Sequence, residues 1–222
     1  QLLPEVTGKV KPGGVYIGVG PEQNFSYLVA LKPKIAFITD VRRGNLHVIL
    51  MYKALFELSA NRVEFVARLF TRDSNVGLPA SSTIRAIMDA SWNTPPGSEA
   101  AFARNLKAIQ DHLTVARKLP LPPEDLEGIA RVYAAFHHYG PSMNYFASTS
   151  LFGAGRRGGN AATYSDLMTQ VDANGKPLSY LASEASFRVI KDLSTRNLIG
   201  PLVGIFPGAK GPGDQGRENR RA

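Results

Sequence analysis

Two glycines and one carboxylate have the types and the spacing of a nucleoside site. Gly18 and Gly20 follow the apolar run 15–17, and Asp40 ends the next apolar run, 35–39. A Gly-x-Gly turn between a strand and a helix lets the backbone approach a ligand, and the first N–H groups of the helix attract an anion. An acid at the end of the second strand accepts hydrogen bonds from ribose hydroxyls.

The glycine pattern is incomplete, which leaves a second interpretation open. The dinucleotide fingerprint has a third glycine three positions after the second, and this chain has Gln23 there. The same residues also suit a tight strand-to-helix turn, with Asp40 capping or pairing nearby. Arg42 and Arg43 follow the acid, so they either contact a phosphate or carboxylate, or form a solvated strand end or an internal pair with Asp40.

Several longer stretches of the sequence carry a family resemblance. They are YIGVGPEQNFSY (16–27), AFITDVRR (36–43), YKALFELS (52–59), YSDLM (164–168) and SYLASE (179–184), with Asn197 and Val203-Gly204. Together they resemble a poorly characterised bacterial family with a methyltransferase-like Rossmann fold. The resemblance implies that Gly18, Gly20, Glu22 and Asn24 line an S-adenosylmethionine pocket, and that Asp40 meets the ribose of that cofactor.

Two departures from the family pattern favour a domain that kept the fold and lost catalysis. The family carries a Gly- and Asp-rich segment before the first strand, and this chain is shorter there. The family also has an acid after the final Val-Gly, where this chain has Ile205. No cofactor is therefore firmly implied, and S-adenosylmethionine is expected only if the pocket is intact.

Two acids in the second half of the chain are weak candidates for a catalytic base. Asp166 and Glu184 lie beside apolar runs, where polar residues line the carboxyl edge of a parallel sheet. The alternative is helix capping, because Ser183 and Glu184 suit the start of a helix. His137 and His138 are adjacent, so on a helix they point about 100° apart and cannot grip one metal ion. We expect no metal site.

Basic residues are the candidates for partner binding. Arg156 and Arg157 lie in the glycine-rich stretch 153–159, which either cradles a phosphate or becomes ordered on a partner. Arg217, Arg220 and Arg221 lie in the Gly/Pro/Arg tail 208–222. The formal net charge of +8 suits an anionic partner, although no run of Lys or Arg exceeds two residues. Nucleic acid is therefore a less favoured partner than protein.

Cysteine and hydropathy narrow the class of protein. The chain has no cysteine, which excludes disulfides, thiolate metal sites and cysteine nucleophiles, and fits a reducing compartment. No apolar run reaches the length of about 18 residues that a membrane-spanning helix needs. We expect a cytoplasmic protein, either free or peripheral to a membrane.

The pattern of apolar runs predicts an α/β fold. We expect a Rossmann-like, methyltransferase-like and mainly parallel sheet in a single domain, 1–207, with a helical insertion at about 60–140. Buried strands are predicted at 14–18, 35–40 and 200–206. Helices are predicted at 24–31, capped by Asn24, and at 46–59, 61–70, 81–90, 98–116, 125–138 and 183–196.

Three functions are consistent with the sequence. The first is a non-catalytic accessory or scaffold subunit of a larger assembly, in one version docked on a membrane complex. The second is an S-adenosylmethionine-dependent methyltransferase with an unknown acceptor. The third, a nucleic-acid-binding protein, rests mainly on charge.

Overall fold

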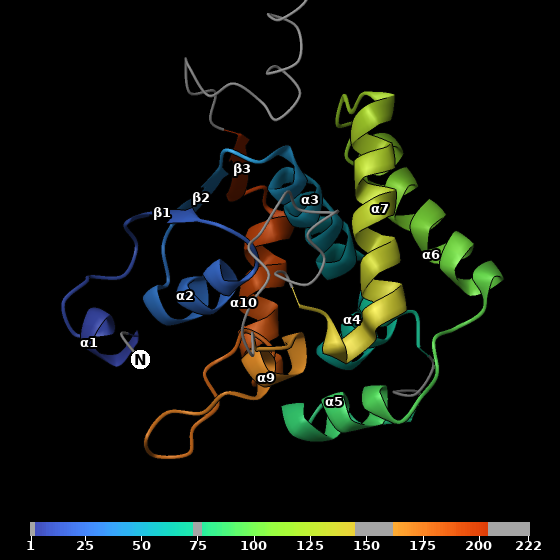
Figure 1. Ribbon diagram of the computed structural model, residues 1–222. Helices are drawn as coiled ribbons and strands as arrows, with labels where there is room; N and C mark the ends of the chain where they lie inside the picture. The colour runs from blue at the N-terminus through green and yellow to red at the C-terminus, as the bar shows by residue number, and fades with distance from the viewer. Residues whose placement is uncertain (1–2, 73–76, 145–161, 204–222) are drawn as a thin grey trace, which may run out of the picture.

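A small parallel sheet lies at one side of a helical body (Figure 1). The computed structural model describes residues 3–72, 77–144 and 162–203. Its strands are β1 (Val15–Val19), β2 (Ile35–Asp40) and β3 (Ile199–Val203), and β2 lies between the other two. Both pairs are parallel, with Val15 opposite Ile35 and Ala36 opposite Ile199. The prediction of a parallel α/β fold is confirmed, with three strands in the described ranges.

Helices fill the long crossover from β2 to β3, and α2 connects β1 to β2. The α-helices are α1 (Leu3–Thr7), α2 (Gln23–Leu31), α3 (Arg43–Leu58), α4 (Arg62–Phe70), α5 (Ile84–Trp92), α6 (Glu99–Asp111), α7 (Pro123–Tyr139), α9 (Tyr164–Thr169) and α10 (Glu184–Thr195). A π-helical turn, η2 (His112–Ala116), extends α6, and a 3₁₀ turn, η3 (Gly140–Ser142), follows α7. The predicted helices occur, while α1 and α9 are additional and the predicted helix 98–116 changes to π geometry at His112.

Polar side chains define where several helices begin. The N-cap side chains of Asn61, Thr83, Ser98 and Ser183 each accept a hydrogen bond from a backbone N–H in the first turn of α4, α5, α6 and α10. Such a bond satisfies a donor that has no partner within the helix, which fixes the start of each helix. α2 is different, because Glu22 occupies its N-cap position and makes no side-chain capping bond there. The prediction that Asn24 caps this helix is wrong.

The core is an aromatic cluster around α3. Phe25, Tyr52, Phe56, Phe65 and Tyr180 are all buried. Phe25 meets Phe56 edge-on with ring centroids 5.3 Å apart, and Phe56 stacks on Phe65 at 4.6 Å. These pairs join α2, α3, α4 and the segment before α10, so residues far apart in the sequence fix one arrangement.

Only one face of the sheet is covered by described helices. Ala36, Ile38 and Gly18 are buried on the face that packs against α2 and α3. The other face carries Val15, Ile17 and Val19, which are 65%, 71% and 77% exposed. The prediction of a buried strand at 14–18 is therefore wrong for this face. So is the described part of the prediction at 200–206, where Leu202 of β3 is exposed, and residues 204–206 lie outside the described residues. The strands lie at the upper left of Figure 1, with the labelled helices below and to the right.

Two buried charges hold the helical body together by different means. Glu57 of α3 accepts hydrogen bonds from Lys53, His112 and Arg117, at 2.7, 2.7 and 2.5 Å. Arg72 is also buried, but in the described ranges no carboxylate pairs with it. Its guanidinium donates to the carbonyl of Ser91, in the last turn of α5, and packs against Gly140, the C-cap of α7. Helix C-termini carry partial negative charge, which favours a cation at this position.

Candidate functional site

The turn after β1 is the centre of the predicted site. Gly20 has a φ of +95°, a backbone conformation that favours glycine, and a Cβ on it would meet nothing within 4 Å. Gly18 has the opposite surroundings, because a Cβ there would overlap with the Asn24 side-chain oxygen and lie 2.6 Å from the Tyr16 ring. The space beside Gly18 is thus filled by protein side chains. Internal geometry explains both glycines.

Asn24 closes the turn with all of its polar atoms. Its amide nitrogen lies 3.3, 3.1 and 2.8 Å from the carbonyl oxygens of Val19, Gly20 and Pro21. Its side-chain oxygen accepts a hydrogen bond of 2.7 Å from the Tyr16 hydroxyl. The sequence assigned Asn24 to helix capping or to a cofactor pocket, but its side chain is bound to the carbonyl groups of the turn.

A second amide, from α3, reaches the same turn. Asn45 is buried and donates to the carbonyl of Gly20 at 3.1 Å. Sequence analysis did not assign this residue to the site. The only signal was its place five residues after Asp40, in the first turn of the helix that follows the second strand. Asn24 and Asn45 together hold the turn from two helices.

Asp40 lies at the carboxyl end of β2, where the sequence placed it, and is already bound by its neighbour. Arg42 donates to its carboxylate from the backbone N–H at 2.9 Å and from the guanidinium at 3.1 and 2.9 Å. Burial alone would raise the pKa of the Asp40 carboxyl, and the bonds from Arg42 more than offset burial and lower it. The sequence left open whether Arg42 contacts a ligand or pairs internally with Asp40, and in the structure it pairs with Asp40.

Glu22 points into the core instead of lining an open pocket. It is fully buried, and its charge raises the pKa of two buried tyrosines, Tyr164 and Tyr180. The hydroxyl oxygens of these tyrosines lie 2.7 Å apart, and burial is the main cause that raises both pKa values. The stretches YSDLM and SYLASE thus contribute side chains to the interior beneath the glycine turn.

Sequence analysis missed a buried carboxylate, Asp125, which pairs with the half-exposed Arg43 beside the carboxyl edge of the sheet. Asp125 at the start of α7 accepts two hydrogen bonds of 2.7 Å from the Arg43 guanidinium and one of 2.8 Å from His47 Nε2. These bonds lower the pKa of the Asp125 carboxyl, and the one from Arg43 is the largest cause. The partners are 82 and 78 residues apart in the sequence, so no local pattern could have indicated the pair. The imidazole of His47 packs against Gly128.

The two weak catalytic candidates both take capping positions. Asp166 forms a capping box with Thr163 at the start of α9, and its carboxylate is exposed. Glu184 is the first residue of α10 and accepts from the backbone N–H of Arg62 at 3.2 Å and from Arg188 at 3.2 Å. Glu184 also borders an open groove of about 340 Å³ between the N-termini of α5 and α10. The structure does not bring these two acids to the glycine turn.

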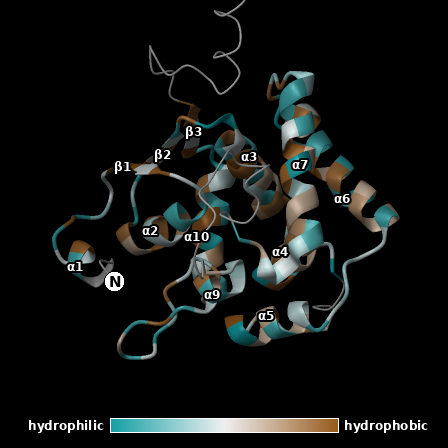
Figure 2. Cartoon of the chain, in the orientation of Figure 1, coloured by the Kyte–Doolittle hydropathy of each residue, from teal (hydrophilic) through white to brown (hydrophobic). Residues whose placement is uncertain are grey.

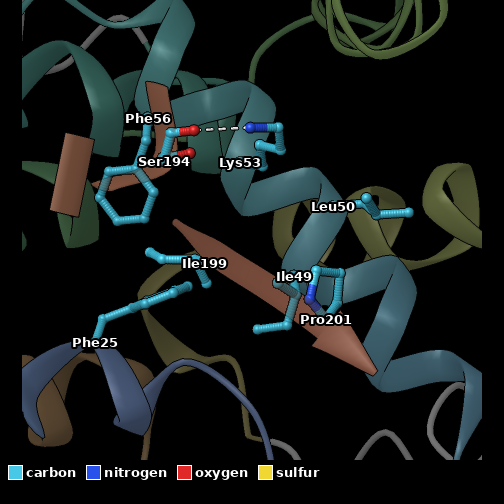
Figure 3. A pocket seen from close by; sticks show the side chains of 8 residues that line it. All are labelled: Phe25, Ile49, Leu50, Lys53, Phe56, Ser194, Ile199 and Pro201. Carbon is cyan, nitrogen blue, oxygen red and sulfur yellow. Dashed lines mark hydrogen bonds between the residues drawn. The ribbon is translucent and has the colours of Figure 1, made fainter. Parts of the chain in front are cut away.

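Figure 3 shows how closely the covered face of the sheet packs on α3. Phe25, Ile49 and Pro201 surround a cavity of about 10 Å³, next to the bond of 2.8 Å from Lys53 to the carbonyl of Ser194. A cavity of this volume holds one water molecule at most. A nucleoside does not fit between sheet and helix at this place.

The remaining predicted positions fall into two groups. His137 and His138 lie in the last turn of α7, as expected of histidines at a helix end. Arg156, Arg157, Arg217, Arg220, Arg221 and Ile205 lie outside the described residues. Within the described ranges, no three His, Cys, Asp or Glu side chains gather as a metal site requires, and no helix combines the length and apolarity of a membrane span.

Comparison with known proteins gives a family and no activity. The chain belongs to the family described as Domain of unknown function (DUF7790), which matches residues 4–209. No curated protein matches the chain. The match covers all of the site around the glycine turn but assigns it no chemistry, so the function has to be argued from geometry.

Proposed function

We propose that this chain is a non-catalytic accessory subunit of a larger protein assembly, built on a methyltransferase-like α/β fold. The observation that carries the proposal is the filled space beside Gly18. Asn24 and Tyr16 occupy this space, so no ligand atom can lie beside the first glycine of the turn. The polar atoms of Asn24 bind the turn itself.

Strand order supports the same proposal. A Rossmann sheet has the order 3-2-1-4-5-6, and its ligand crevice lies where strand 4 adjoins strand 1. The three strands here correspond to the half 3-2-1, and in the described part of the chain β1 has a neighbour on one side only. The second wall of the crevice is thus not contributed by any described strand, so a cofactor would contact one wall alone.

Charge and location complete the proposal. A chain with a net charge of +8 favours an anionic protein partner. The absence of cysteine fits the cytoplasm, including the cytoplasmic surface of a membrane complex.

One observation favours the second candidate, an S-adenosylmethionine-dependent methyltransferase. Gly20 has the conformation of a nucleotide-binding turn and open space beside it, and Asp40 ends the adjacent strand. For this function Arg42 would have to release the Asp40 carboxylate to the ribose.

Isothermal titration of the full chain with S-adenosylmethionine and S-adenosylhomocysteine tests the non-catalytic part. We expect no saturable heat at millimolar ligand from folded protein. A dissociation constant below about 100 μM, near −5.5 kcal/mol, would refute the proposal if Asp40→Asn abolishes it while Asp89→Asn does not. Asp89 of α5 is the control because it is a carboxylate remote from the turn.

Native size chromatography of the untagged chain from its own cells tests the assembly part. An accessory subunit elutes well ahead of the monomer of the same protein purified alone, and moves to that monomer position in high salt. Elution as a monomer at physiological salt would contradict it. Loss of the large form on nuclease treatment would instead show that the basic chain binds nucleic acid.

A further inference from the structure

Among the described residues, the second face of the sheet is an apolar surface that no helix covers, and the outer edge of β1 has no neighbouring strand. We define the open sheet surface as Val15, Ile17 and Val19 of β1 with Phe37 and Leu202, which follow on the same face of β2 and β3. Figure 2 shows hydrophobic residues on these strands. Parallel sheets are normally covered on both faces, and contiguous exposed apolar residues mark interaction sites.

The register shows which backbone groups of β1 face outward. Gly20 N–H donates to Thr39 and the Gly14 carbonyl accepts from Lys34, so even-numbered residues of β1 direct their backbone groups toward β2. Backbone direction alternates along a strand. Val15, Ile17 and Val19 therefore direct their backbone groups away from β2, toward the outer edge of β1. The carbonyl of Val19 already accepts from the amide of Asn24 at 3.3 Å, so these three residues offer five backbone groups for pairing.

Basic side chains gather at the amino end of this edge. Lys9, Lys11, Lys32 and Lys34 are exposed, and none forms an ion pair within the described part of the chain. Two backbone bonds hold the segments together, from Gly13 N–H to Lys32 at 2.9 Å and from Lys34 N–H to Gly14 at 2.8 Å. The positive charge is thus next to the start of β1.

We propose that a β-strand of a different protein adds to the free edge of β1. Its residues alternate between apolar and polar, and acidic residues lie at the end next to the four lysines. Main-chain hydrogen bonds supply affinity in this mode of binding, and alternate side chains supply specificity. The inference deepens the proposed accessory function and rests on it, since it names the kind of partner that the subunit holds.

The observations favour this occupant over a lipid surface and over a second copy. Lipid would cover the valines but would leave the N–H and C=O groups of the edge without partners. A second copy would bring four more lysines and a further charge of +8. Asp40 at the carboxyl end of β2 and Asp125 in the first turn of α7 are already paired with arginines and cannot neutralise those lysines.

Selection from a displayed library of random peptides of about twelve residues tests the proposal, since that length spans β1 with room at both ends. The target is the full chain, and the selected peptides are synthesised and titrated by fluorescence polarisation. We expect alternating apolar residues with acids at one end, and binding at least about tenfold weaker to Ile17→Asp than to the wild type. Val115→Asp is the matched control, because Val115 of η2 is 70% exposed and Ile17 is 71% exposed.

Three results would overturn the inference. The first is that no peptide is enriched, or that enriched peptides bind Ile17→Asp and Val115→Asp equally. The second is dimerisation in sedimentation experiments that Ile17→Asp abolishes, which would assign the surface to a second copy. The third is Ile17-dependent flotation with phosphatidylserine vesicles, which would assign it to lipid. Each result is independent of the cofactor titration, so the inference can fail while the non-catalytic proposal stands.

Discussion

If Asn24 fills the space beside Gly18, then substitutions at the two positions must depend on one another. Asn24→Ala removes the bond from Tyr16 and the bond of 2.8 Å to the Pro21 carbonyl, while Asn45 still donates to Gly20. Loss of these partly buried bonds costs about 2 kcal/mol. Gly18→Ala places a methyl group onto the Asn24 side chain, and overpacking of this kind costs about 1–3 kcal/mol.

In the double variant the alanine methyl no longer meets the amide, and the Tyr16 ring, 2.6 Å from that methyl, can shift because its bond to Asn24 is gone. We expect the double variant to be destabilised by about 2 kcal/mol instead of the additive 4, a coupling of about 2 kcal/mol. For a chain of this length each kcal/mol corresponds to about 2–4 °C in Tm. Urea denaturation followed by far-UV circular dichroism measures all four free energies of unfolding.

The control for this cycle is Gln23→Ala, an exposed neighbour on α2, which should change stability by less than about 0.5 kcal/mol. Additivity of Gly18→Ala and Asn24→Ala within about 0.5 kcal/mol would refute the argument. The space beside Gly18 would then be open in solution, and the main support for a non-catalytic function would be lost.

Two further predictions concern the buried carboxylate of Glu57 and the contact between Gly128 and His47. Burial alone would raise the pKa of the Glu57 carboxyl, and the bonds from Lys53, His112 and Arg117 lower it below its ordinary value of 4.5. The contribution of Glu57 to stability is therefore present above pH 4.5 and is lost as the pH falls through the lowered pKa. In urea titrations, Glu57→Gln should lower the free energy of unfolding by about 3 kcal/mol or more at pH 7 and by less at pH 3.5. An equal loss at both pH values would contradict this assignment. Gly128→Ala should destabilise the protein by about 1–3 kcal/mol, although helix propensity alone favours alanine by about 1, because the methyl overlaps with the His47 ring. In a His47→Ala background the same change should become stabilising in thermal melts, and destabilisation there would show that the ring is not the obstacle.

The sequence predicted the strands and most helices because each is marked locally. Apolar runs bounded by Gly and Pro indicate β1 and β2, and Ser183 with Glu184 marks the start of α10. Asp40 was placed correctly at the end of β2, and its pair with Arg42, two residues away, was one of the alternatives that the sequence left open.

What the sequence did not reveal depends on contacts between distant elements. The exposure of Val15 and Ile17 was missed because an apolar run looks the same whether a neighbour covers it or not. No local sequence pattern indicates the bonds from Arg43 and His47 to Asp125, because α3 and α7 are far apart in the sequence and meet only in the folded chain. Asn24 was interpreted as an N-cap because asparagine is common at that position. In the structure its amide nitrogen donates to the turn carbonyls and its side-chain oxygen accepts from the Tyr16 hydroxyl.

The position of Arg72 has a consequence for how the helical body opens. Its charge is buried, no carboxylate of the described residues pairs with it, and the ends of α5 and α7 balance it, while the residue itself follows α4. If α5 or α7 detached, the guanidinium would lose a compensating helix end, and if α4 detached, the guanidinium would be drawn away from both; a buried charge without compensation is strongly unfavourable. The three helices are therefore bound into one cooperative unit, which opens as a whole and not one helix at a time.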